Sequence, residues 1–117
     1  MQIISGGLFD EGHSATGVIP FDLKHLARQT MGDEMLALEI LGMFRRQIEG
    51  MSERMRGCDL QSRREMAHAL VGSARGVGAG AIAACAAAIE KNPANDEGIT
   101  QLAKLICEAN EFISRLR

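Results

Sequence analysis

The stretch DEMLALEILGMFRRQIEGMSERMRG, residues 33–57, decides the fold class. Its apolar residues recur every three or four positions, which is the spacing of one face of an α-helix. They are Leu36, Ile40, Met43, Phe44, Ile48, Met51 and Met55. Asp33 is a good N-cap residue and Gly57 a good end signal, so the stretch predicts a single amphipathic helix of about six turns.

Helices are also predicted before and after this stretch. A short helix is predicted after Asp22 and ends near Gly32. Three further helices are predicted, one starting at Asp59, an Ala-rich one over residues 79–91, and one over the C-terminal residues. No run alternates with period two, so no strand is expected. The sequence therefore predicts an all-α fold, an antiparallel four-helix bundle with a short extra N-terminal helix. The expected domain is 21–117, after a Gly-rich flexible leader over 1–20.

Composition narrows the function classes. The 117 residues carry a net charge of −2 and no Trp or Tyr, which disfavours a nucleic-acid module. No apolar run is long enough to span a bilayer, and we expect a cytoplasmic protein with no membrane association. The three cysteines are widely spaced, and Cys85 and Cys107 are expected in the core.

Two motifs of other functions are incomplete. Glu65 and His68 form one Glu-x-x-His pair, but a di-metal bundle needs two, so no metal site is expected. The glycines of residues 76–80 do not follow a strand, and they predict a tight turn and close helix packing instead of a dinucleotide site.

Unusual residues gather in the stretch AHALVGSARGVGA, residues 67–79. On a helix, His68 lies about 120° from the apolar stripe and should be exposed. The residues within about 40° of it are Gln61, Arg64, Gly72 and Arg75. A neutral imidazole is a good nucleophile near pH 7, and guanidinium groups hold phosphoryl oxygens. A glycine inside a helix costs about 1 kcal/mol relative to alanine, and the cost makes sense where another protein must approach closely.

This stretch resembles the signature of the histidine phosphotransfer (HPt) domain family. The matching residues are Ala67, His68, Leu70, Gly72, Ser73, Ala74, Gly78 and Ala79, followed at suitable spacing by Cys85, Ile89 and Glu90. The resemblance implies a phosphorelay intermediate without catalytic activity of its own. In such a relay His68 takes a phosphoryl group from a receiver aspartate or a sensor histidine kinase and passes it to a receiver domain. The chain itself would need no cofactor, because Mg²⁺ is expected on the partner receiver domain.

The resemblance gives His68 and Gly72 an expected role, and positions on the helix give the expected roles of the other site residues. His68 inherits the phosphorylated position and Gly72 the position that lets a receiver approach. The family's usual Lys is Val71 here, which removes a cation. Arg64 and Arg75 are the expected phosphoryl-stabilising residues, and Gln61, Val71 and Gly72 the expected receiver-docking ones. A monomer is expected.

Charge gives weaker support. Residues 45–75 contain seven Arg and four acidic residues, a balance of +3, which predicts a basic face that would steer an acidic receiver pocket to His68. A solvated helix face explains such a run equally well. The loss of the Lys also leaves a second hypothesis open, a degenerate docking adaptor that binds receivers without carrying phosphate.

Overall fold

The computed structural model describes residues 20–116, which form six helices and contain no strand. The helices are α1 (Leu23–Gln29), α2 (Glu34–Ile48), α3 (Met51–Gly57), α4 (Leu60–Gly76), α5 (Gly80–Lys91) and α6 (Asp96–Ser114). The predicted all-α bundle with a short N-terminal helix is confirmed. The expected leader falls almost entirely on residues 1–19, which lie outside the described residues.

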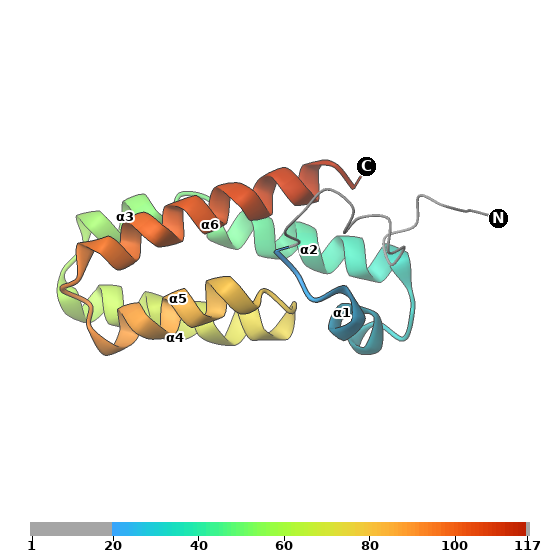
Figure 1. Ribbon diagram of the computed structural model, residues 1–117, viewed down its shortest axis with the longest axis horizontal. Helices are drawn as coiled ribbons and strands as arrows, with labels where there is room; N and C mark the ends of the chain where they lie inside the picture. The colour runs from blue at the N-terminus through green and yellow to red at the C-terminus, as the bar shows by residue number, and fades with distance from the viewer. Residues whose placement is uncertain (1–19, 117) are drawn as a thin grey trace.

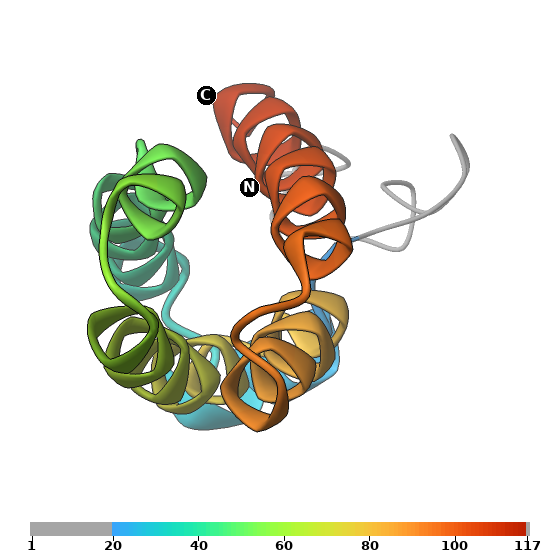
Figure 2. The same cartoon turned by 90° about the vertical axis from the view of Figure 1, so that its left-hand side faces the viewer.

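The bundle has two sides. Figures 1 and 2 show α4 and α5 lying antiparallel along one side, with α2, α3 and α6 along the other. The short helix α1 crosses the end of the bundle next to the α4–α5 turn. This arrangement leaves the outer faces of α4 and α5 uncovered by other helices.

Side-chain caps explain where four helices begin. A carboxylate or amide oxygen at the N-cap accepts a backbone N–H that the helix itself cannot pair. The capping residues are Asp22, Asp33, Asp59 and Asn95. The first three starts were predicted from the sequence, and they are confirmed.

The helix predicted over residues 33–57 is broken, so this prediction was wrong in one respect. Helix α2 ends at Ile48, and its C-cap is Glu49. The next residue, Gly50, adopts a left-handed conformation with φ +70° and interrupts the helix. The Arg54 guanidinium donates to the Glu49 carbonyl at 2.8 Å and braces the break. The apolar periodicity hides the interruption because Ile48, on one side of it, and Met51, on the other, are both buried in the same core.

The buried stripe of α2 also differs from the predicted one. The core takes Ala37, Leu41, Phe44 and Ile48. The expected core residues Leu36 and Met43 are 40% and 62% exposed. Apolar residues cover more than half of the circumference of α2. The spacing of these residues alone therefore does not determine which face of the helix is buried in the core. On α4, the apolar side chain of Leu60 is likewise 50% exposed.

The α4–α5 turn is as tight as the glycines predicted. Gly78 has φ +78°, and a Cβ added there would lie 2.9 Å from the backbone oxygen of Asp22. The Gly78 carbonyl accepts the Asp22 N–H at 2.7 Å, which fixes the start of α1 against this turn. A side chain at Gly78 would therefore separate the two segments.

The cysteines are only partly where they were expected. Cys85 is half-buried, and burial raises the pKa of its thiol. Cys107 is exposed, so its predicted core position was wrong. Within residues 20–116, no helix has the length and apolar character needed to cross a membrane.

Candidate functional site

The site is built on the outer face of α4. Ala67, Leu70 and Ala74 point into the core, and His68 points out with 77% of its side chain exposed. Exposure of this imidazole agrees with the helical spacing read from the sequence. A ring that is open to solvent is accessible to a second protein.

Glu90 on α5 holds the imidazole of His68. Its Oε2 lies 2.7 Å from Nδ1 of His68. A carboxylate only accepts hydrogen bonds, so this contact requires the proton on Nδ1. The neutral ring then carries its free lone pair on Nε2.

The contact between His68 and Glu90 was missed in the sequence reasoning, although Glu90 belongs to the matched signature. The positions of the two residues in the sequence could have predicted this contact, because α4 and α5 form an antiparallel pair around the turn at Gly78. His68 lies ten residues before this turn and Glu90 twelve after it, so the two should meet across the pair.

Gly72 and Gly76 leave bare backbone on the side of α4 that carries His68. They follow the histidine at intervals of four residues, which places them one and two turns along the same face. A Cβ added at either position would meet no atom within 4 Å. The absence of side chains here is therefore not forced by packing within the chain.

The structure also locates the predicted polar neighbours. Arg64 and Arg75 are exposed, and within residues 20–116 neither guanidinium has a hydrogen-bond or ion-pair partner. Gln61 is exposed and donates to the Glu65 carboxylate at 3.0 Å. The two guanidinium groups are thus free to take an anion.

Val71 does not fit its predicted place in a docking surface. It is 8% exposed and belongs to the hydrophobic core. On α4, Val71 belongs to the wide buried stripe that also contains Leu70 and Ala74. A partner could contact little of this side chain, which corrects the expectation from the sequence.

The run of arginines does not form one basic face, which corrects a second expectation. Arg63 is buried, and its guanidinium donates to the Met55 carbonyl at 2.8 Å and to the Pro93 carbonyl at 2.7 Å. The same group lies 3.2 Å from the Asp96 carboxylate. Arg54 braces the break before α3, and Arg56 donates to Thr100 at 2.8 Å. Charge counting could not separate these structural arginines from the free ones.

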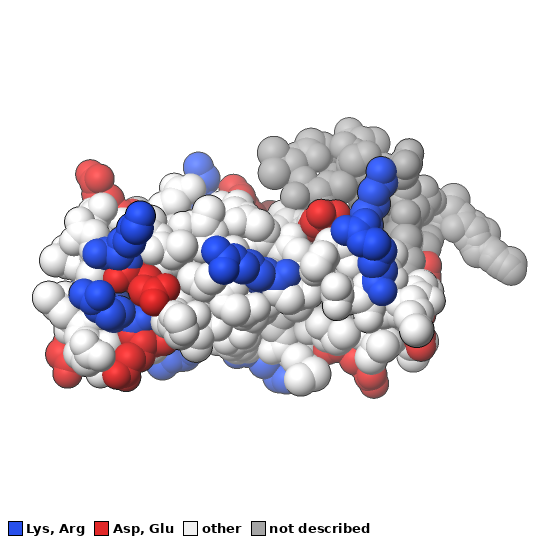
Figure 3. Space-filling view, turned by 90° about the horizontal axis from the view of Figure 1, so that it is seen from below, with Lys and Arg blue, Asp and Glu red and all other residues white. Residues whose placement is uncertain are grey.

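Figure 3 shows the molecule from the α4–α5 side. Acidic and basic side chains gather together at the left end of this view, and basic side chains also lie across its middle and towards its right, with uncharged surface between them. No group of three His, Cys, Asp or Glu side chains in the described part of the chain is arranged to hold a metal ion.

Helix α4 has a well-formed N-cap at Asp59. The Asp59 carboxylate accepts the Ser62 N–H at 2.7 Å, and this bond, with a second one from the Ser62 side chain, lowers the pKa of Asp59. The first turn of the helix that carries His68 is therefore well anchored.

Comparisons with known proteins agree with this geometry. Residues 34–112 match the family model described as Hpt domain. No curated protein and no solved structure matches the chain. Hpt domains are phosphocarriers and not independent enzymes, and they interact with two-component kinases and receiver domains. Since the match covers well over half of the sequence, this chain belongs to the Hpt domain family and has a phosphotransfer role in a phosphorelay.

Proposed function

We propose that His68 carries the phosphoryl group, accepting it from a receiver aspartate or a sensor histidine kinase and passing it to a receiver domain. The observation that supports this most is the exposed imidazole whose Nδ1 is held by Glu90 at 2.7 Å. We assign this role to the domain 21–117, acting in the cytoplasm as a monomer.

The transfer uses Nε2 as the nucleophile. Its lone pair attacks the phosphorus of an aspartyl phosphate, a nitrogen–phosphorus bond forms, and the aspartate leaves as a carboxylate with the electrons of the broken phosphorus–oxygen bond. The imidazole keeps its proton on Nδ1 and becomes positively charged. The Glu90 carboxylate stabilises that charge, and transfer to the next receiver reverses these steps.

The neighbours of His68 determine how closely a receiver can approach and how the charge of the phosphoryl group is stabilised. Gly72 lets the receiver's active site come close to Nε2, and Gln61 lies at the edge of the docking surface. Arg64 and Arg75 bind phosphoryl oxygens once the group has arrived. Mg²⁺ and the acidic pocket belong to the receiver, so this chain supplies a positioned nucleophile.

A docking adaptor remains the second candidate. The observation in its favour is Val71, which stands where the family's usual Lys would add a cation near the phosphoryl group. Such an adaptor would bind receivers and never become phosphorylated.

Phosphoryl transfer from radiolabelled donors distinguishes the two. The purified chain is incubated with each phosphorylated receiver and sensor kinase of the source cell, alongside His68→Gln and the control His25→Gln. We expect acid-labile label on the wild type and on His25→Gln, and none on His68→Gln. Label that persists on His68→Gln would refute the site, and receiver binding without any label would favour the adaptor.

A further inference from the structure

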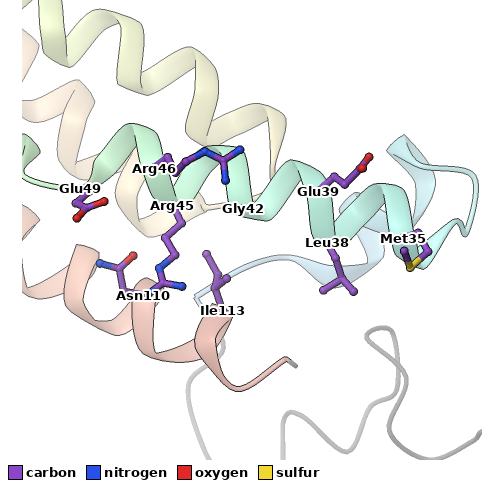
Figure 4. A pocket seen from close by; sticks show the side chains of 9 residues that line it. All are labelled: Met35, Leu38, Glu39, Gly42, Arg45, Arg46, Glu49, Asn110 and Ile113. Atoms are coloured by element: carbon purple, nitrogen blue, oxygen red, sulfur yellow. The ribbon is translucent and has the colours of Figure 1, made fainter.

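A groove of about 650 Å³ runs between α2 and α6. Figures 1 and 2 place these two helices across the bundle from the exposed face of α4. Figure 4 shows that Met35 and Leu38 project from α2 on the side of the groove that Ile113 of α6 also lines. The groove therefore offers an apolar surface that is separate from the His68 site.

The polar side chains that line this groove have no partner within residues 20–116, and two of them, those of Arg45 and Asn110, lie between α2 and α6; the full set is Glu39, Arg45, Arg46, Glu49 and Asn110. The side-chain Oδ1 of Asn110 is buried and accepts no hydrogen bond. The Arg45 guanidinium, which Figure 4 shows directed towards Asn110 and Ile113, forms no hydrogen bond or ion pair. Glu39 and Arg46 project from the other side of α2. The groove thus fits an occupant with apolar side chains, a carboxylate and a free N–H.

The chain itself enters beside this groove. The ring of Phe21 packs on Phe44 of α2 and on Phe112 of α6, with centroid distances of 6.0 and 5.7 Å. Residues 1–19 therefore join the described part of the chain next to the same two helices. From Pro20, twelve residues reach back to Leu8, and an extended chain of that length spans about 40 Å.

The sequence of this segment matches what the groove lacks. Residues 8–11 read Leu-Phe-Asp-Glu, with two apolar side chains followed by two carboxylates. Asp10 and Glu11 are the only acidic residues among 1–19, which contain no Lys or Arg. A tethered segment also binds at a high effective concentration, so a small contact area suffices.

We propose that Leu8–Glu11 docks into the α2–α6 groove of its own chain. Leu8 and Phe9 cover Leu38 and Ile113, a carboxylate of Asp10 or Glu11 pairs with Arg45, and a backbone N–H of the segment donates to Asn110 Oδ1. The docked segment leaves His68 open, because the groove lies on the opposite side of the bundle. This contact does not depend on phosphotransfer.

Nuclear Overhauser contacts in the full chain test the proposal. We expect cross-peaks from the Phe9 ring to the methyl groups of Leu38 and Ile113. In an equal mixture of labelled and unlabelled chains, these peaks should arise within one chain only. Their absence would overturn the proposal, and peaks between chains would show that a second copy fills the groove instead.

Substitutions provide the matched controls. Phe9→Ser should remove the shifts of the groove methyl groups, while Ile3→Ser should leave them unchanged. Arg45→Glu should release the segment, and adding Asp10→Lys and Glu11→Lys should restore the contacts. Equal effects of Phe9→Ser and Ile3→Ser, or no rescue by the charge exchange, would contradict the assigned pairing. Phosphorylation of His68 should be the same in all these variants.

Discussion

Glu90 gives the first prediction at the scale of single residues. Glu90→Ala removes the acceptor for Nδ1, so the ring populates both tautomers and phosphotransfer should slow by about ten- to a hundredfold. Glu90→Gln keeps an oxygen that accepts from Nδ1–H, and should retain more activity. Nitrogen-15 shifts of His68 report the tautomer directly. Wild-type tautomer and rate in Glu90→Ala would show that the 2.7 Å contact has no role in transfer.

Gly72 tests whether a partner needs the bare backbone beside His68. Gly72→Ala should stabilise the fold by up to about 1 kcal/mol, because its Cβ meets no neighbour and alanine favours the helix. Gly72→Gln should fold equally well and slow transfer by about a hundredfold, since a long side chain displaces the incoming receiver.

Gly57→Gln is the matched control for Gly72→Gln. It adds the same side chain at a helical glycine of α3 that also has open space around it. Thermal unfolding and transfer rates are measured together. Equal transfer by Gly72→Gln and Gly57→Gln would mean that receivers do not approach the backbone at Gly72.

Among residues, the sequence predicted exposure and burial where a helix has one clear apolar stripe. His68 and Gly72 followed from the spacing on α4. The burial of Val71 and the exposure of Met43 did not follow from the spacing, because each residue lies at the border of a wide apolar arc. Only the packing partner decides which side of that arc faces the core.

At the scale of the helices, Asp59 makes the stability of α4 depend on pH. Its pKa is lower in the folded chain than in the unfolded chain, because the carboxylate accepts the Ser62 N–H. The ionised carboxylate therefore stabilises the fold above the unfolded pKa of about 3.9. This contribution is lost as the pH falls through the lower, folded-state pKa.

Comparison of the wild type with Asp59→Asn isolates this effect. Asparagine still caps the helix but cannot ionise, so the wild type should be the more stable at pH 7, and the difference should shrink as the pH falls below about 4. Urea unfolding at several pH values measures it. A difference that stays constant with pH would contradict the assigned cap.

Helix starts were easier to predict than helix interruptions. Asp22, Asp33 and Asp59 cap helices through local hydrogen bonds, which depend on nearby residues alone. The break at Gly50 escaped prediction because α2 and α3 continue one apolar period. The pairing of His68 with Glu90 needed the register of α4 against α5, which the turn at Gly78 sets.

At the scale of the whole molecule, the bundle presents two different sides. The α4–α5 side carries the proposed phosphoryl site, and the α2–α6 side carries the groove proposed for residues 8–11. The apolar spacing predicted the bundle, but the charge count could not predict this division, because the arginines of residues 45–75 are shared between buried contacts, the groove and the His68 face.

The position of the phosphoryl group on the phosphorylated chain tests the proposed role of His68 most directly. Long-range proton–nitrogen and phosphorus-31 NMR spectra identify both the residue and the ring atom. We expect one phosphohistidine, His68, phosphorylated on Nε2, with the Nδ1 proton still donated to Glu90. Phosphate on Nδ1 of His68, or on His25, would contradict this expectation.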